Sequence, residues 1–251
     1  MIDFHSHVLP GIDDGAKDLE TAVAMLEESK RQGVTTVVCT PHYYGRKRSP
    51  AHFFNKRQEA YELLAPHIPE GMELKLGAEV FFTEDSVLSG EQLAQFCIEG
   101  TRYVMIELPF TPTIGERVFE RLESFIAETD CIPIIAHVDR YPAVLKKPAI
   151  LQRLTEMGCL LQMNVEALEV KGVKSFAVAA LKKGLISAVG TDMHNMGDRA
   201  PNMKIYSMAL QSHGLPIELL QKIADTEYAI LSNRRVKAGG GKLRRIFGKY
   251  F

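Results

Sequence analysis

A recurring order of segments constrains the fold of this chain more than any other feature. Three times a helical pattern ends at a glycine and an apolar run follows at once; the glycines are Gly33, Gly158 and Gly184. After an N-terminal strand that ends at His7, the expected strands cover residues 34–39, 74–82, 103–108, 132–138, 159–165 and 185–191. These runs are apolar on both faces, which is typical of parallel strands buried under helices.

The alternation of strands and helices predicts the fold class. About seven strands alternate with helices along 251 residues, and this favours one barrel-like (β/α) domain. The first helix is predicted to begin near Asp18, which is a suitable N-cap, and to end at Gly33. A doubly wound open sheet is the alternative, but no Gly-x-Gly-x-x-Gly turn follows the first strand.

Composition excludes several classes of protein. The net charge of -1 provides no basic field for nucleic acid, so no nucleic-acid partner is expected. No apolar run approaches the roughly 18 residues of a membrane span, and the N-terminus does not resemble a secretion signal. The cysteines form no C-x-x-C motif, so we expect reduced thiols in a cytoplasmic protein. They are Cys39, Cys97, Cys131 and Cys159.

The C-terminal segment differs in character from the rest of the chain. We predict a single catalytic domain over residues 1–238 and a basic, aromatic tail over 239–251, which begins with three glycines. A basic segment with interleaved apolar side chains fits an anionic membrane surface or an acidic partner. A frayed terminus, or a segment that packs between the subunits of an oligomer, is the alternative.

Histidines and carboxylates are placed where a barrel gathers its functional groups. Side chains with a function cluster at the C-terminal ends of parallel strands, and five of the eight histidines are expected there. His5 and His7 would project side by side, because alternate residues of a strand share a face. Glu79 and Glu107 lie within apolar strands, where a carboxylate needs a partner. The remaining histidines lie in polar surroundings and are not expected to be ligands; they are His52, His67 and His213.

Imidazoles and carboxylates together suit divalent metals. The candidate ligands are His5, His7, Asp14, His42, Glu79, Glu107, His137, Asp192 and His194. This set exceeds the four ligands of one zinc-like site, so it implies two or three ions. Clustered ions of this kind are typical of phosphoester hydrolysis.

A series of short motifs follows the same order as the strands. They are Asp3-Phe4-His5-Ser6-His7, Thr40-Pro41-His42, Gly77-Ala78-Glu79, Ile106-Glu107, Ala136-His137-Val138-Asp139-Arg140 and Thr191-Asp192-Met193-His194-Asn195. In this order they resemble the motif series of the PHP (polymerase and histidinol phosphatase) superfamily. Residues 7–15 and 192–195 resemble, more narrowly, the bacterial capsule-associated PHP tyrosine phosphatases. The match extends from Ile2 to about Pro201.

The resemblance implies a distorted seven-stranded (β/α) barrel of PHP type that holds three divalent ions, often manganese, with iron, zinc or magnesium as alternatives. The implied ligand sets are His5, His7, Glu79 and Asp192 for one ion, Glu79, Glu107 and His137 for a second, and Asp14, His42 and His194 for a third. Arg140 and Arg199 match phosphate-binding arginines, and guanidinium groups bind phosphate oxygens in pairs. Asp139 departs from the glutamate usual in the family before this arginine.

The activity implied is hydrolysis of phosphotyrosine by a metal-activated hydroxide. The partner implied is the tail of a membrane-associated bacterial tyrosine kinase that regulates capsule or exopolysaccharide synthesis. The loop after His42 is expected at the mouth of the site, where Tyr43, Arg46 and Arg48 are candidates for drawing in an acidic peptide. A cysteine-based phosphatase is excluded, because no cysteine is followed six residues later by arginine.

Three alternatives to a protein-tyrosine phosphatase stay open. The first is a small-molecule phosphatase that resembles histidinol phosphatase. The second is a metal-stabilised module that docks on a kinase without catalysis, although a pure scaffold has no need of open metal positions. The third is a nuclease of the same superfamily, which the near-neutral charge disfavours.

Overall fold

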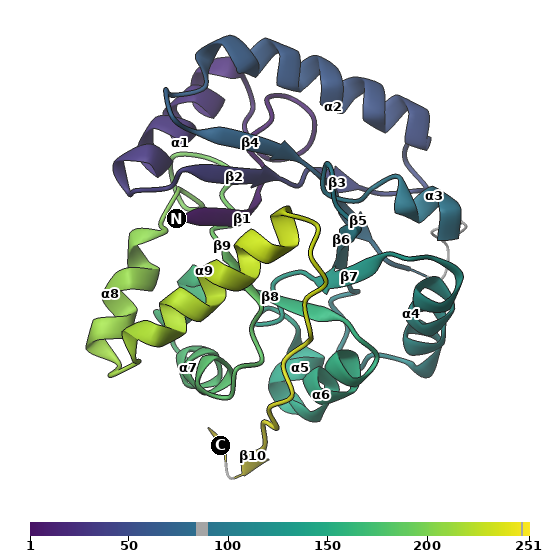
Figure 1. The fold of residues 1–251 in the computed structure, drawn as a ribbon, viewed down its shortest axis with the longest axis vertical. Helices are drawn as coiled ribbons and strands as arrows, with labels where there is room; N and C mark the ends of the chain where they lie inside the picture. Colours follow the sequence, from purple (N-terminus) through teal and green to yellow (C-terminus); the bar gives the residue numbers. More distant parts are fainter. Residues whose placement is uncertain (84–89, 247) are drawn as a thin grey trace.

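Parallel strands form a curled sheet at the centre of the molecule (Figure 1), as seen in a computed structural model that describes residues 1–83, 90–246 and 248–251. One sheet has the order β1 (Ile2–Ser6), β2 (Thr36–Cys39) and β4 (Glu73–Leu76). The other has the order β3 (His42–Tyr43), β5 (Glu79–Phe81), β6 (Tyr103–Glu107), β7 (Ile132–Ile135), β8 (Leu160–Asn164) and β9 (Ala188–Gly190). A parallel bridge between Ser6 and Met193 joins β1 to the segment after β9, so the curled sheet closes on itself.

Two of the strands are interrupted, and this distorts the barrel. Thr40 and Pro41 separate β2 from β3, and proline has no N–H to donate to a neighbouring strand. Gly77 and Ala78 separate β4 from β5, so the strand predicted over 74–82 is two strands that belong to different sheets. Counted as single interrupted strands, the two pairs and the five other strands occupy seven positions, as the sequence predicted.

Helices surround the sheet (Figure 1). They are α1 (Leu19–Arg31), α2 (Pro50–Leu64), α3 (Gly90–Ala94), α4 (Glu116–Glu128), α5 (Pro142–Lys146), α6 (Ala149–Glu156), α7 (Lys174–Lys182), α8 (Lys204–Ser212) and α9 (Ile217–Leu231). The predicted ends of α1 are confirmed: the Asp18 side chain accepts a hydrogen bond from Thr21 N, and Gly33 has a φ of 86°. Among the described residues, no helix combines the length and apolar character needed to cross a bilayer.

Helix α9 lies across the strands in the view of Figure 1 and closes one end of the barrel. Its Ile230 packs in a buried cluster that takes side chains from strands around the sheet, including Phe4, Val38, Ile134 and Leu160. The apolar filling of this end leaves the carboxyl ends of the strands as the place for polar groups.

Glu227 is a buried carboxyl on α9. It is 3% exposed, and its Oε1 accepts a hydrogen bond from Val189 N at 2.9 Å. Burial raises the pKa of Glu227 well above its usual value, and the hydrogen bond from Val189 only partly offsets this. The folded protein therefore keeps this proton at pH values where the unfolded chain releases it, so stability falls as the pH rises above the unfolded pKa.

Replacing Glu227 by glutamine is expected to raise the unfolding temperature by several degrees at about pH 8. Glutamine keeps an oxygen for Val189 N and removes the titration. The gain should shrink toward about pH 5, where the unfolded carboxyl also holds its proton for more of the time. Thermal unfolding of both proteins across this range measures it; a gain that does not vary with pH would contradict the assignment.

The C-terminal segment returns along the molecule and ends in a short antiparallel hairpin of β10 (Arg245–Ile246) and β11 (Lys249–Tyr250). The glycines before it pack closely on the domain. A Cβ at Gly239 would lie 2.1 Å from Gly184 O, and one at Gly241 would lie 2.1 Å from Lys183 O. The predicted break at these glycines is thus a place where backbone packs on backbone.

Candidate metal centre

All nine predicted ligands lie around the carboxyl ends of the strands. They come from β1 and the loop after it, β3, β5, β6 and the segments after β7 and β9: His5, His7, Asp14, His42, Glu79, Glu107, His137, Asp192 and His194. Seven of the nine are buried, His42 is half-buried and Asp14 is exposed. The distances between their side chains divide them into three groups that share members.

The first group surrounds the ends of two imidazoles. His5 Nε2 and His7 Nε2 lie 3.2 Å apart. Glu79 Oε2 lies 3.2 Å from the first of these nitrogens and 3.3 Å from the second. Asp192 Oδ1 lies 3.7 Å and 3.4 Å from the same two atoms. Two nitrogens and two carboxylate oxygens thus face one small volume, as the ligands of a single ion do.

The second group uses the other oxygen of Glu79. Glu79 Oε1 lies 2.7 Å from His137 Nε2, and Glu107 Oε1 lies 3.5 Å from the same nitrogen. Glu107 Oε2 is also 3.9 Å from His42 Nδ1. Because its two oxygens face different groups, Glu79 could contribute one oxygen to each of two ions.

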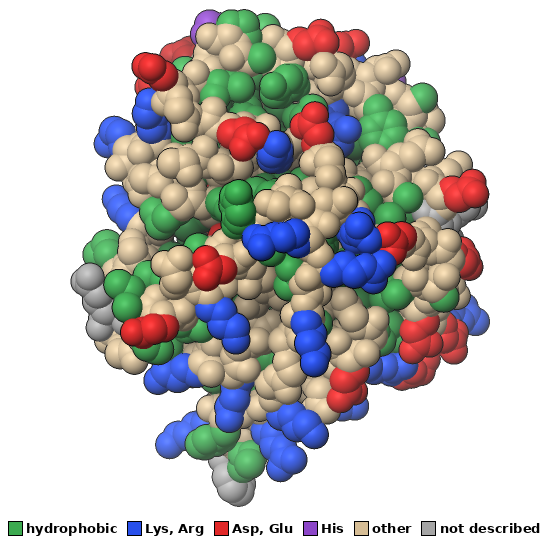
Figure 2. All heavy atoms as spheres, viewed as in Figure 1, with side chains coloured by type: hydrophobic (Ala, Val, Ile, Leu, Met, Phe, Trp, Pro, Cys, Tyr) green, Lys and Arg blue, Asp and Glu red, His purple; other side chains and the backbone are tan. Residues whose placement is uncertain are grey.

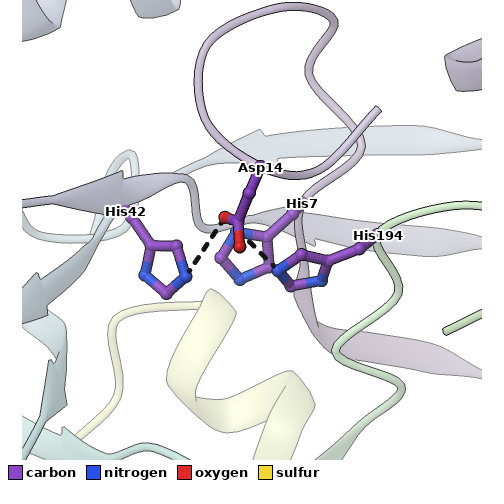
Figure 3. Close-up of side chains that lie close together, drawn as sticks. All are labelled: His7, Asp14, His42 and His194. Carbon is purple, nitrogen blue, oxygen red and sulfur yellow. Dashed lines mark ion pairs between the residues drawn. The ribbon is translucent and has the colours of Figure 1, made fainter. Parts of the chain in front are cut away.

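The third group includes the one exposed ligand, Asp14, and its side chains are drawn in Figure 3. Asp14, on the loop between β1 and α1, points toward two imidazoles: its Oδ1 is 3.6 Å from His42 Nε2 and 3.7 Å from His194 Nε2. The His7 ring lies between them, with its centre 4.4 Å from that of His42 and 4.0 Å from that of His194. His7 therefore connects this group to the first.

The imidazoles are oriented by partners on their outer nitrogens. His7 Nδ1 lies 2.7 Å from Asp13 Oδ2, and His194 Nδ1 lies 2.9 Å from the Asp192 carbonyl oxygen. His5 Nδ1 lies 3.2 Å from Gln162 Oε1. Since each acceptor requires a proton on Nδ1, each Nε2 is left with a lone pair directed into the cluster. This arrangement prepares neutral histidines to bind metal.

The charge balance of the cluster also calls for cations. Burial raises the pKa of Glu79, but the positive charges of His5 and His137 outweigh it and bring that pKa well below its usual value. Burial lowers the pKa of His137, but the charge of Glu79 outweighs it and raises that pKa to about 10. Burial and the charge of His7 lower the pKa of His194 to about 3. A carboxylate-rich cluster that draws protons onto buried imidazole will bind divalent ions in their place.

Several buried atoms of the candidate ligands have no hydrogen bond to the described residues. Among them are Glu79 Oε2 and His194 Nε2, although other ligand atoms lie within 4 Å of each. Leaving buried polar atoms without partners is costly. Coordination of shared ions satisfies both, so the residues present fit a group of divalent metals.

Backbone strain accompanies two of the ligands. His137 has a φ of 28° and Asp192 a φ of 53°, values that non-glycine residues seldom adopt. Such conformations cost about 1–3 kcal/mol each and concentrate at functional sites. Here both turn a side chain into the cluster directly after a strand ends.

Gly190 allows β9 to approach His5, and its replacement tests the packing beneath the cluster. A Cβ at position 190 would lie 2.6 Å from His5 N and 2.7 Å from His5 Cβ. We expect Gly190→Ala to displace His5, to cost about 1–3 kcal/mol of stability and to lower the bound metal. Metal analysis and thermal unfolding measure this. Gly115→Ala is the control, because a Cβ there meets nothing within 4 Å; equal metal content in the two variants would contradict the expectation.

Both predicted arginines reach the cluster through Asp192. Arg140 Nη1 lies 2.8 Å from Asp192 Oδ2, and Arg199 Nη2 lies 2.7 Å from Asp192 Oδ1. Their side chains are 41% and 31% exposed, so each guanidinium keeps a side open to solvent. Together with Asn164 they line a cavity of about 570 Å³ beside the ligands. This cavity has room for a phosphorylated side chain.

The loop after His42 lies beside the outer ligands, but one of the three residues predicted for the rim does not face them. Tyr43 is 1% exposed and packs against Phe53 and Phe96, so it belongs to the core and not to the rim. The reason is strand alternation: His42 turns toward the ligands, and the next residue must turn away. Tyr44 contacts the His42 ring instead, at 5.2 Å between ring centres.

The basic residues of this loop lie near the surface. Arg48 donates a hydrogen bond from Nη1 to Ile12 O, and Arg46 is exposed in the turn before it. Arg48, Lys47 and Tyr44 line a second cavity, of about 300 Å³, that also contains Asp14 and His42. The loop therefore borders the outermost group of ligands.

Three residues that contact the ligands were not predicted from the sequence. Gln162 Oε1 accepts from His137 N at 2.6 Å besides facing His5, and Asn164 Nδ2 donates to Asp192 Oδ2 at 3.0 Å. Their signal was polar residues two apart within an apolar strand. Phe110, 43% exposed, stacks on the His137 ring with centres 5.4 Å apart and lies 5.1 Å from the Arg140 guanidinium carbon. No local sequence signal distinguished it.

A curled parallel sheet with a histidine and carboxylate cluster at its carboxyl edge defines the class as a metal-dependent hydrolase. The family described as capsular polysaccharide synthesis, CpsB/CapC, matches residues 1–214 of the chain. The chain therefore belongs to the CpsB/CapC family, in agreement with the resemblance seen in the sequence.

Alignments with two named relatives cover most of the chain. Tyrosine-protein phosphatase CpsB of Streptococcus pneumoniae is 30% identical over 224 residues, which cover 85% of this chain and 91% of that protein. Tyrosine-protein phosphatase YwqE of Bacillus subtilis (strain 168) is 32% identical over 212 residues, with 79% of each covered. A crystal structure from a study of YwqE and CpsB, described as unique metal-dependent tyrosine phosphatases, superposes with a TM-score of 0.81 at 25% identity. That superposition covers 96% of this chain and 98% of the other.

Proposed function

We propose that this chain hydrolyses phosphotyrosine in a protein substrate, using divalent metals held by the nine clustered ligands. The observation that carries the proposal is the junction of this cluster with the cavity lined by Arg140 and Arg199. A phosphoryl group in that cavity would lie between the metal ligands and the two guanidinium groups. The relatives named tyrosine-protein phosphatases support the choice of substrate.

The metal ligands and the two arginines would have different roles in the reaction. Divalent ions bound by such a cluster supply Lewis acidity, and they lower the pKa of coordinated water toward neutrality. Burial lowers the pKa of Arg140, but the charge of Asp192 outweighs it and raises that pKa, so the guanidinium stays cationic. Arg140 and Arg199 would hold equatorial oxygens of the phosphoryl group and offset the charge that develops on them.

The leaving group of phosphotyrosine needs little help from a general acid. A tyrosine phenolate has a free pKa of about 10, so it departs with less help from a general acid than an alkoxide does. The wall of the site beside His137 and Arg140 is the Phe110 ring. An exposed aromatic face at this place suits contact with the ring of phosphotyrosine.

Removing the Phe110 ring is expected to weaken selection of aromatic esters. Phe110→Ala should reduce the preference for a phosphotyrosine peptide over a phosphoserine peptide by about 1 kcal/mol, roughly fivefold in the ratio of kcat/KM. Phe110→Tyr keeps the ring and should retain the preference. Steady-state kinetics on both peptides measure the ratio, and an unchanged ratio in the alanine variant would remove Phe110 from substrate recognition.

The proposed function also includes a particular metal and a particular protein substrate. Manganese is the metal we propose, because the resemblance to the PHP superfamily implies it; iron, zinc and magnesium are the alternatives. The partner we propose is the phosphorylated tail of a membrane-associated bacterial tyrosine kinase that controls capsule or exopolysaccharide assembly. The basic residues Arg46, Lys47 and Arg48 beside the outer ligands suit an acidic peptide segment.

A comparison of substrates tests the proposal against its main rival. Purified protein with manganese should release phosphate faster from a phosphotyrosine peptide than from histidinol phosphate. Faster turnover of histidinol phosphate would favour a small-molecule phosphatase. Release from neither compound, with a full complement of bound metal, would favour a docking module without catalysis.

A further inference from the structure

The basic tail is anchored on the domain at both ends of its hairpin. Leu243 is 4% exposed and belongs to the main hydrophobic core. The Tyr250 hydroxyl donates to Leu145 O at 2.8 Å, and its ring meets Phe176 edge-on with centres 5.4 Å apart. Arg244 and Phe251 also exchange two backbone hydrogen bonds. These contacts hold the hairpin in one place, which argues against a frayed terminus.

Charge is strongly segregated between this tail and the rest of the chain. The residues after Asn233 include seven Lys and Arg and no Asp or Glu, whereas residues 1–233 carry 23 Lys and Arg against 31 Asp and Glu. Lys242, Arg244, Arg245 and Lys249 form no ion pair with the described residues. Their charges are therefore available to a partner.

Exposed apolar side chains accompany these charges. Ile246 is 50% exposed and Phe251 is 56% exposed, although side chains of this kind are usually buried. Figure 2 shows hydrophobic atoms between Lys and Arg side chains at the bottom of the molecule, where the hairpin lies. Apolar side chains among unpaired cations, on a projecting hairpin, are typical of segments that enter a membrane interface.

We infer that the C-terminal hairpin, in which the structure describes residues 242–246 and 248–251, docks on an anionic phospholipid surface. The cations would lie at headgroup phosphates, and Ile246 and Phe251 would enter the boundary between headgroups and acyl chains. A symmetric contact with a second copy through this hairpin would bring two patches of the same four cations together, which charge repulsion opposes. An acidic protein would match the charge but would leave the two exposed apolar side chains unexplained.

Vesicle flotation tests this inference without reference to catalysis. The full chain should float with vesicles of phosphatidylcholine and phosphatidylglycerol, should stay behind with phosphatidylcholine alone, and should lose binding as the salt concentration rises. Arg244→Glu with Arg245→Glu should lower the partition coefficient by roughly 30-fold or more, because each basic residue near the surface contributes about fivefold. Ile246→Ser with Phe251→Ser should lower it with the charge unchanged.

The control moves the same charge to a distant place. Lys17→Glu with Lys56→Glu changes two exposed cations near α1 and in α2, at the end of the molecule opposite the hairpin in Figure 1. It should float like the unchanged protein. Equal loss in the control, or no preference for anionic vesicles, would overturn the inference. Retention on immobilised polyglutamate without vesicle binding would overturn it in favour of an acidic protein partner.

Discussion

Replacing His137 by alanine is expected to remove measurable phosphatase activity and to lower bound metal by about one ion per chain. His137 Nε2 lies 2.7 Å from Glu79 Oε1 and 3.5 Å from Glu107 Oε1, so it faces both carboxylates of the second group. Without it, two buried carboxylates would lack the nitrogen that completes their group. Elemental analysis of purified protein and phosphate release from a phosphotyrosine peptide measure both effects.

The matched control for this change is His52→Ala. His52 is exposed on α2, away from the cluster, and was not predicted to be a ligand. It should leave metal content and turnover unchanged. A His137 variant that keeps its full complement of metal would contradict the assignment of the second group.

Replacing Arg140 by alanine is expected to leave the bound metal in place but to lower kcat/KM roughly 100-fold. This corresponds to a loss of about 3 kcal/mol in transition-state stabilisation. The guanidinium contacts Asp192 on one side and opens into the cavity on the other, where it would meet the phosphoryl oxygens. The loss should therefore appear in transition-state binding and not in metal content. Steady-state kinetics and elemental analysis on the same preparation separate the two.

Two further variants define what this arginine contributes. Arg140→Lys keeps the charge without the planar fork, so it should recover only part of the loss. Arg31→Ala removes an exposed arginine that pairs with Glu28 far from the site, and it should have no effect. Unchanged kcat/KM in the Arg140→Ala protein would exclude this residue from the site.

The ligand cluster was predictable because its geometry follows from strand order. The carboxyl ends of parallel strands meet at one edge, so histidines that end successive strands must gather there. His5, His42 and His137 are far apart in the sequence. The position of each could still be predicted, because it depends only on the correct prediction of the strand that precedes or contains it. The barrel could be predicted for the same reason, since each strand was visible as a local apolar run.

Tyr43 shows how a correct local motif can still give a wrong residue. The loop was placed at the mouth of the site, but the strand continues one residue past His42. Alternation then sends Tyr43 into the core beside Phe53, a contact that lies outside the motif. Similarly, the apolar run of residues 74–82 gave no sign that its two halves join different sheets.

The supporting residues were less predictable because their partners are distant in sequence. Gln162 and Asn164 orient ligands from β1 and from the segments after β7 and β9, and nothing near them in the chain reveals this. Phe110 gains its role from the rings and the guanidinium that happen to surround it. Candidate ligands can be recognised from their residue type and their position at strand ends. The residues that orient them can be recognised only once the fold is known.

A metal titration followed by activity measurements tests most directly whether the protein depends on bound metal. Protein stripped of divalent ions by a chelator should release no phosphate from a phosphotyrosine peptide, and activity should return in step with manganese bound to the chain. The nine-ligand cluster predicts that full activity requires more than one ion per chain. A stripped protein that hydrolyses the peptide at the full rate would contradict metal-dependent hydrolysis by this cluster.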